Sequence, residues 1–297
     1  MKTSKFSRIG LVGRPDHSGV VTSLEKLASY LKGKELTIIA DSGTADLLEN
    51  QTLEVVPKAD LGDSCDLVIV VGGDGSILNI AKHLLSTKVP VIGVNRGKLG
   101  FLTDILPDEI EPKLDEVLAG SCSMEERFLL DIYLLGNDDS KHLGSALNDV
   151  VLHPGSAAQM IEFELFIDDV FVYSQESDGL IIATPTGSTG YSLSCGGPIV
   201  MPESDNFIIT PIAPHNLNVR PLIVSDDNII TLEIVDNSTH KFLLSMDSRN
   251  QYIKNSTPII IKKAEHSIKL VEIESINYSK TLREKLLWGL DTRNNEV

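Results

Sequence analysis

The spacing of apolar residues along the chain changes near residue 125. Before that point, short apolar runs alternate with segments in which apolar residues recur every three or four positions. The runs predict strands over 8–12, 35–40, 66–71 and 89–94. The helical spacing is that of Leu24, Leu27, Ala28 and Leu31, of Ile77, Ile80, Ala81 and Leu84, and of Ile110, Leu114, Val117 and Leu118. Strands that alternate with helices predict a parallel sheet covered on both faces.

After residue 125 the pattern is typical of a β-rich domain. Short strand-like runs occupy 128–135, 160–167, 180–183, 229–235, 242–246, 258–261 and 268–273, and turn-forming residues separate them. These runs predict a layered sheet or sandwich. The segment 281–290 is again helical in its spacing, and we expect it to pack back onto the first domain. The chain is therefore divided into an α/β domain over 1–125, a β-rich domain over 126–275, and a C-terminal helix within 276–297.

Composition excludes several classes of protein. With 297 residues, 42% hydrophobic and 23% charged, the chain is an ordinary globular sequence. Its net charge of -16 disfavours nucleic-acid binding. No apolar run reaches membrane-spanning length, and the first residues lack the apolar core of a signal peptide. Three widely spaced cysteines indicate neither a disulfide framework nor a zinc cluster, so we expect no metal held by the chain and a reducing cytoplasm.

The run Gly72-Gly73-Asp74-Gly75 carries the strongest chemical signal. It follows a buried strand and precedes a helix, so its backbone can approach a phosphate at the helix N-terminus. A carboxylate in that position would repel a phosphate, unless it takes a proton from an attacking hydroxyl or holds a magnesium ion. The alternative is a tight turn in which Asp74 caps the helix. Three glycines in four residues favour the functional interpretation.

A second signal lies in the segment Thr184 to Pro198, which follows the apolar run 180–183. Its hydroxyls and glycine N–H groups are neutral donors suited to phosphate and ribose oxygens, and Tyr191 could stack on a ring. An ordinary Ser/Thr/Gly loop is the alternative. Asn148-Asp149 interrupts an apolar stretch and could bind a ribose diol or an adenine edge, although taken alone it favours a β-bulge or turn. Asp178 is either a turn residue or a ligand contact.

Two common signatures are absent from the sequence. There is no G-x-x-x-x-G-K-[ST] phosphate loop and no G-x-G-x-x-G dinucleotide fingerprint. Cations that could neutralise a phosphate donor are Arg96, Lys98, Arg220 and Arg249.

Taken together and in this order, these segments resemble the bacterial NAD kinase family. The matching pieces are Val70 to Gly75, Gly93 to Leu102, Asn148 to Gly155, Asp178 to Ile181, and Thr184 to Pro198, and the likeness extends from about Ile9 to the C-terminal helix. Lipid kinases and phosphofructokinases share the Gly-Gly-Asp-Gly run. The segment Thr184 to Pro198 makes the match specific.

The resemblance implies phosphorylation of the adenosine ribose 2′-hydroxyl of NAD, which gives NADP. ATP would be the donor with a divalent cation, expected to be Mg²⁺, and the enzyme would be a homo-oligomer, a dimer or tetramer. Asp74 matches the catalytic aspartate. The residues that match NAD contacts are Asp74, Gly75, Asn148, Asp149, Asp178, Thr189, Gly190, Tyr191, Ser192, Leu193 and Ser194.

This chain departs from the family pattern at several positions. Asp149 stands where Glu is usual, and Gly190 where Ala is common. Further pocket positions, Gln159, Glu176, Ala213 and Arg249, match the family less closely, with Glu176 in the place of an Arg and Arg249 in the place of a Gln.

Two rival functions remain open at this point. One is another kinase of the Gly-Gly-Asp-Gly type, acting on a lipid or a sugar phosphate. The other is a nucleotide sensor without chemistry, which would not need Asp74. The phosphate donor, ATP or polyphosphate, also stays undecided.

Overall fold

The structure is a computed structural model that describes residues 5–14, 19–48, 53–96, 100–103, 105–136, 140–156, 159–235, 241–254, 257–273 and 278–286. The chain divides into two compact units. The first comprises Met1–Glu126 and Ile268–Val297, and the second comprises Arg127–Ser267. The chain passes from the first unit to the second within one strand and returns within another, so neither boundary coincides with a loop.

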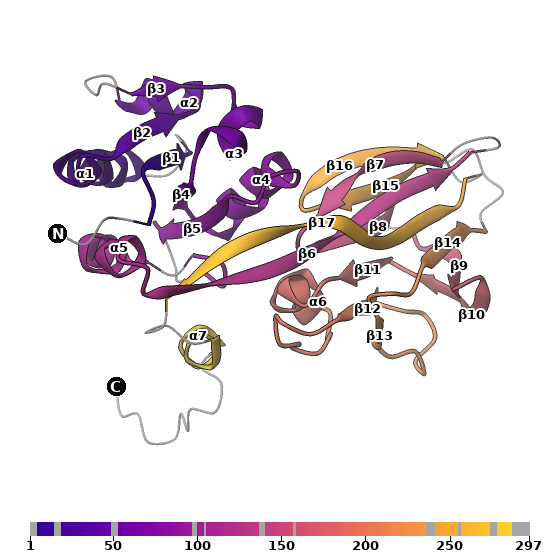
Figure 1. The fold of residues 1–297 in the computed structure, drawn as a ribbon. Helices are drawn as coiled ribbons and strands as arrows, with labels where there is room; N and C mark the ends of the chain where they lie inside the picture. The colour runs from indigo at the N-terminus through magenta and orange to yellow at the C-terminus, as the bar shows by residue number, and fades with distance from the viewer. Residues whose placement is uncertain are drawn as a thin grey trace, which may run out of the picture. The chain divides into compact units, whose positions relative to one another are not determined.

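The first unit is built on a parallel sheet (Figure 1). Its strands are β1 (Arg8–Gly13), β2 (Thr37–Ala40), β3 (Glu54–Val55), β4 (Leu67–Gly72) and β5 (Pro90–Asn95). They pair in parallel in the order β3-β2-β1-β4-β5, and β17 (Ile259–Ile273) adds its last residues in parallel beside β5. The order reverses between β1 and β4. In open α/β sheets, ligands bind beyond the carboxyl ends of the strands at such a point.

Helices cover this sheet as the apolar spacing predicts. They are α1 (Val20–Gly33), α2 (Ser42–Ala45), α3 (Leu61–Ser64), α4 (Asp74–Leu84) and α5 (Ile110–Leu118), and the first unit also contains α7 (Tyr278–Leu286). The predicted faces of α1 and α5 are fully buried in one core with Ile9, Leu67 and Val271. Helix α4 contacts β4 and β5. The parallel α/β arrangement predicted for this half of the chain is therefore confirmed.

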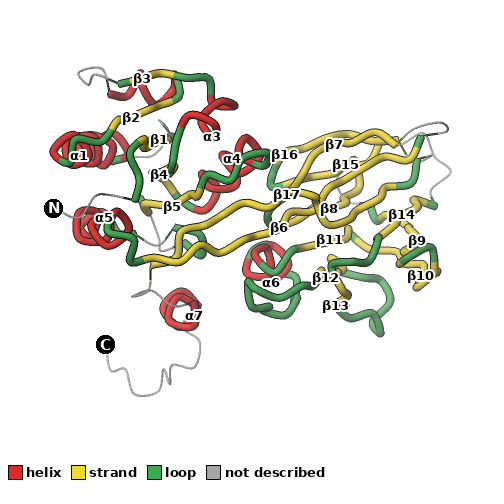
Figure 2. The backbone as a smooth tube through the Cα atoms, in the orientation of Figure 1, coloured by secondary structure: helices red, strands yellow, loops and turns green. Residues whose placement is uncertain are grey.

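The second unit consists almost entirely of antiparallel strands, and α6 (Tyr191–Ser194) is its one α-helix among the described residues (Figure 2). Its strands are β6 (Cys122–Leu135), β7 (Ser140–Ala146), β8 (Asp149–Pro154), β9 (Ile161–Ile167), β10 (Val170–Ser177), β11 (Gly179–Ala183), β12 (Asn206–Ile212), β13 (Leu222–Ser225), β14 (Ile230–Ile234), β15 (Lys241–Met246), β16 (Arg249–Lys254) and the first part of β17.

The strands of the second unit form two layers. One is a six-stranded sheet in the order β13-β12-β11-β8-β15-β16. In the other, β10, β9, β14 and β17 follow one another, and β6 pairs with β17 and β7. Buried residues of both layers, such as Phe163 and Phe207, share one apolar core. The prediction of a mostly β second domain built from layered sheets is confirmed.

Three local predictions differ from the structure. The runs 258–261 and 268–273 are one continuous strand, β17, because strand pairing carries the backbone through the polar residues between them. The segment after Thr184 contains a 3₁₀-helix, Thr186–Thr189, and α6 rather than loop alone. The second unit ends at Ser267, whereas the sequence placed that boundary after residue 275. In the described part of the chain, no helix has the length and apolar composition needed to cross a membrane.

Candidate functional site

Asp74 lies where strand β4 turns into helix α4. Every residue of β4 is buried, and the strand ends at Gly72. Gly73 has extended backbone angles, and Asp74 is the first residue of the helix. A Cβ on Gly72 would overlap the Ser76 side chain of the first helical turn. The glycine run thus allows a tight strand-to-helix turn with its carboxylate at the N-terminus of α4.

The Asp74 carboxylate is held by a neighbouring loop. Its Oδ2 accepts the backbone N–H of Phe101 at 2.8 Å, and its Oδ1 accepts the N–H of Leu102 at 3.0 Å. The Thr103 hydroxyl lies 3.3 Å from the same Oδ1. A Cβ on Gly100 would overlap this carboxylate, so the loop can approach only because residue 100 is glycine. These donors fix the orientation of Asp74.

The loop after β5 therefore supplies amide donors, where the sequence suggested cations. The Arg96 guanidinium lies against Gly19, and Lys98 lies outside the described residues. The cation nearest to the carboxylate in the described structure is Lys285 of α7, whose Nζ lies 3.6 Å from Asp74 Oδ2. Neither Phe101 nor Lys285 was predicted as a site residue, and only the helical spacing within 281–290 pointed to α7.

In the second unit, Asn148 and Asp149 are held by a single carboxylate. Asp247 accepts the backbone N–H groups of Leu147 at 2.6 Å, Asn148 at 2.9 Å and Asp149 at 3.2 Å. Asp247 and Ser248 have φ of 45° and 66° and form the turn between β15 and β16. Asp247 was not predicted as a site residue, although its place in an Asp-Ser turn between two strands was a signal for it.

Burial affects Asn148 and Asp149 in different ways. It leaves the amide oxygen of Asn148 without a partner among the described residues, and it raises the pKa of the Asp149 carboxyl. The Asn148 Oδ1 is buried and has no hydrogen-bond partner among the described residues, so it can accept a ligand N–H or O–H. Burial and the carboxylate of Asp247 raise the pKa of Asp149 to about 7. Burial also raises the pKa of Asp247, against the three N–H groups and Arg249. Asp149 therefore exchanges its proton near neutral pH.

This pKa predicts a pH-dependent stability. In an unfolded chain the same carboxyl titrates near about 3.9, so between about pH 4 and pH 7 the folded protein holds a proton that the unfolded chain has lost. The free energy of unfolding contributed by this group therefore falls as the pH rises, by on the order of 4 kcal/mol. Urea unfolding of the wild type and of Asp149→Asn should show the wild type losing that much relative to the variant across this window. A difference that stays constant with pH would contradict the assignment.

The segment after Thr184 packs against the backbone of Asn148. The Thr184 N–H donates to the Asn148 carbonyl at 2.9 Å, and the Thr184 hydroxyl donates to the Leu147 carbonyl at 2.5 Å. The Gly187 N–H in turn donates to that hydroxyl at 3.1 Å. A Cβ on Gly187 would overlap the Asn148 main chain. The two segments that the sequence singled out are thus bound to each other.

The predicted contact residues of this segment differ in exposure. Thr189, Gly190 and Leu193 are partly exposed, Tyr191 and Ser194 are exposed, and Ser192 is buried with its hydroxyl 2.9 Å from that of Thr210. Burial raises the pKa of Tyr191, and Cys195 and the charges of Asp178 and Asp149 raise it further. Tyr191 therefore lies close to both predicted carboxylates.

Two glycines in this segment make a matched test of packing. Gly187→Ala forces its methyl group into the Asn148 main chain, and we expect it to lower the free energy of unfolding by about 1–3 kcal/mol. At Gly190 the nearest atoms are the Gly187 carbonyl at 3.1 Å and the Asn148 and Asp149 side chains at 3.6 Å. Gly190→Ala should therefore lower the free energy of unfolding by less than Gly187→Ala does. Equal losses for the two variants in urea unfolding would contradict the packing described.

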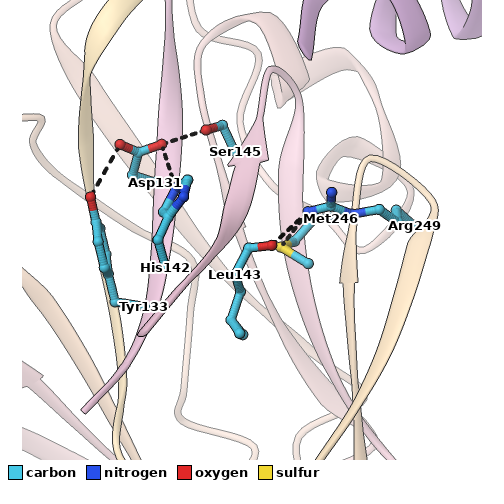
Figure 3. Close-up of polar contacts among 7 residues, drawn as sticks. All are labelled: Asp131, Tyr133, His142, Leu143, Ser145, Met246 and Arg249. Carbon is cyan, nitrogen blue, oxygen red and sulfur yellow. Dashed lines mark hydrogen bonds and ion pairs between the residues drawn. The ribbon is translucent and has the colours of Figure 1, made fainter. Parts of the chain in front are cut away.

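The remaining predicted positions are placed as follows. Asp178 is exposed and its N–H donates to the Ile212 carbonyl at 3.0 Å, next to Ala213. Glu176 is exposed and its carbonyl accepts the His215 N–H at 2.9 Å. Gln159 accepts a hydrogen bond from Ser156. The Nη2 of Arg249 donates to the Leu143 carbonyl at 3.0 Å on β7 (Figure 3).

The second unit places its predicted residues at the two ends of β11. Asp178 and Ala213 lie at its start, next to the Gly179–Ile212 pair, and Asn148 and Asp149 lie beside Ala183 at its end. Arg249 acts on the second of these pairs through Asp247, whose pKa its charge lowers. Among the described residues, no three His, Cys, Asp or Glu side chains are grouped so that they could hold a metal ion.

Comparison with known proteins identifies the family of the chain. Residues 9–122 match the model of the ATP-NAD kinase N-terminal domain, and residues 147–273 match the model of the ATP-NAD kinase C-terminal domain. The chain is 44% identical over 290 residues to the NAD kinase of Teredinibacter turnerae, covering 97% of this chain and 99% of that one. It is 46% identical over 285 residues to the NAD kinase of Chromohalobacter salexigens, covering 96% and 97%.

Two solved structures are also similar. Yeast NADH kinase complexed with NADH superposes with a TM-score of 0.88 at 26% identity, covering 100% of this chain and 94% of that one. An NAD kinase from Archaeoglobus fulgidus in complex with ATP gives a TM-score of 0.74 at 27% identity, covering 94% and 97%. With both domain models matched in order and relatives aligned over nearly the full length, this chain belongs to the NAD kinase family of phosphotransferases.

Proposed function

We propose that this protein transfers the terminal phosphoryl group of ATP to the adenosine ribose 2′-hydroxyl of NAD and so forms NADP. The observation that carries the proposal is the carboxylate of Asp74, held at the start of α4 by the amides of Phe101 and Leu102. The similar structures were solved with NADH and with ATP, the two ligand classes that this reaction needs.

The reaction is a direct displacement at phosphorus. The ribose 2′-oxygen forms a bond to the γ-phosphorus while the bond from that phosphorus to the β–γ bridging oxygen breaks, and ADP leaves. The hydroxyl proton passes to Asp74. Positioning and charge neutralisation provide most of the catalysis in such transfers, and a general base adds about 10²–10⁴-fold.

The second unit provides the groups that would bind NAD. The buried Asn148 Oδ1 accepts no hydrogen bond from the described residues, and a ribose hydroxyl or an adenine amino group can donate one to it. Asp149 accepts from a ribose hydroxyl once it is ionised. Tyr191 is 42% exposed and offers its ring for stacking, beside Thr189, Gly190 and Ser194.

The divalent cation, proposed to be Mg²⁺, does not fit a site held by the chain. Both oxygens of Asp74 already accept donors, and the described residues contain no cluster of metal ligands. We therefore assign the cation to the phosphates of ATP.

We further propose that the protein is a cytoplasmic homo-oligomer. Among the described residues, Cys65, Cys122 and Cys195 form no disulfide, and thiols are the form expected in a reducing compartment.

A product assay tests this function. Purified protein is incubated with NAD, ATP and Mg²⁺, and NADP is measured with an NADP-specific dehydrogenase. Polyphosphate replaces ATP in a parallel reaction to identify the donor. We expect NADP to accumulate with ATP. A folded protein that forms no NADP with either donor would refute the proposal and leave a lipid kinase, a sugar-phosphate kinase or a sensor as the alternatives.

A further inference from the structure

Helix α7 presents a cation to the carboxylate of Asp74. The Nζ of Lys285 lies 3.6 Å from Asp74 Oδ2 and 3.9 Å from the centroid of the Phe101 ring. The same Phe101 donates its backbone N–H to Oδ2 and has its ring 6.1 Å from that of Tyr278, at the start of α7. One residue therefore connects the proposed base, the cation and the helix that carries it.

The pair differs from the surface ion pairs of this protein. The side chains of Lys285 and Asp74 are 20% and 29% exposed, whereas those of Lys280 and Glu284 on the same helix are 59% and 50% exposed. Partial burial strengthens a charge interaction, and an aromatic face adds to the attraction of an ammonium group. Thr281 and Leu282 are buried and anchor the helix, so the backbone of Lys285 is fixed near Asp74.

Other cations named from the sequence are engaged elsewhere. The Nη1 of Arg220 donates to the carbonyls of Leu217 and Val219 in its own loop, at 2.6 Å and 2.8 Å. Arg249 donates to Leu143 on β7. In a chain with a net charge of -16, a phosphate donor needs a local cation, and Lys285 is positioned to supply it.

We propose that Lys285 is a catalytic residue that binds the terminal phosphate of the donor, and that the pair with Asp74 is its resting state. This inference rests on the function proposed above. A distance of 3.6 Å is longer than a good hydrogen bond, so the ammonium is attracted to the carboxylate without being locked to it. A triphosphate carries more negative charge than one carboxylate, and it draws the flexible lysine away.

This exchange couples donor binding to the activation of the base. While Lys285 lies beside Oδ2, the ammonium and the Phe101 N–H occupy the space around that oxygen, so a substrate hydroxyl has no room to approach it. When the ammonium moves to the phosphate, Oδ2 becomes available to accept the hydroxyl proton. The same charge then stabilises the phosphoryl group during transfer. Asp74 is thus kept inactive until ATP is present.

Steady-state kinetics of three variants test the proposal. Lys285→Met should raise the KM for ATP and lower kcat, each by about tenfold or more, while the KM for NAD stays within about twofold. Lys285→Arg, which keeps the charge, should recover most of the activity. Lys280→Met is the matched control on the same helix and should stay within about twofold of the wild type in every parameter. Lys285→Gln replaces Lys285→Met if the latter fails to fold.

The outcomes separate this inference from the function itself. If the wild type forms NADP and Lys285→Met matches it within about twofold, Lys285 has no role in donor binding and the inference is wrong. Equal rises in the KM for ATP and NAD, with no recovery by Lys285→Arg, would indicate a structural role only and would also overturn it. If the wild type forms no NADP, the Kd for ATP, measured by calorimetric titration of the wild type and of Lys285→Met, still tests the inference. The inference then requires weaker ATP binding to Lys285→Met than to the wild type.

Discussion

Asp74→Asn should lower kcat by about 10²–10⁴-fold, because the variant has no carboxylate to accept the hydroxyl proton. The affinity for NAD should change little, since the Asn148 and Asp149 contacts remain. The measurement is kcat from the NADP assay together with the Kd for NAD from calorimetry. A loss of turnover below about tenfold would remove Asp74 from the mechanism.

The hydrogen bonds of Asp74 indicate that Asp74→Asn also lowers the free energy of unfolding, which the sequence alone does not show. Both Asp74 oxygens accept backbone N–H groups, at 2.8 Å and 3.0 Å. An asparagine offers one oxygen and one NH₂, so one N–H of Phe101 or Leu102 would face another donor, which costs about 1–3 kcal/mol. Thermal unfolding must therefore accompany the kinetics. Asp63→Asn, at an exposed position of α3, makes the same chemical change and should leave kcat within about twofold.

The second large effect is expected at Asp247. Asp247→Ala leaves three consecutive N–H groups, those of residues 147–149, without their acceptor. Each unpaired amide costs about 1–3 kcal/mol when buried, so the free energy of unfolding should fall by about 3 kcal/mol or more. The turn that carries Asn148 and Asp149 also loses its anchor, and NAD affinity should fall with it. Removing the Asp247 charge should lower the pKa of Asp149, because that charge helps to raise it.

Asp168→Ala is the matched control for Asp247→Ala. Asp168 also lies in a turn with positive φ, 50°, and it accepts the Ile229 N–H at 2.8 Å and the Asn228 amide. These groups are exposed, so the loss should be about 1 kcal/mol. Urea unfolding of the two variants compares them directly. If Asp247→Ala costs no more than Asp168→Ala, Asp247 does not organise the turn.

Patterns that depend on neighbouring residues were determined by the sequence alone. The apolar run of β4 and the helical spacing of α4 predicted both elements, and the glycines between them predicted the turn that carries Asp74. The hydrophobic spacing also predicted the parallel first unit and the β-rich second unit. Asp168 and Asp169 connect β9 and β10 with positive φ at both residues, as turn-forming residues between two strand-like runs predict.

The partners of the site residues were decided only by the tertiary structure. Asp74 is held by amides 27 and 28 residues away, and Leu147 is held by a carboxylate 100 residues away. A backbone N–H is present at nearly every position, so no residue type in the sequence marks the ones that become donors. In the sequence, nothing distinguishes Lys285 from other lysines on an amphipathic helix. Its closeness to Asp74 depends on the packing of α7 beside Phe101. Local sequence fixes which elements form, and long-range packing fixes which groups they bring within bonding distance.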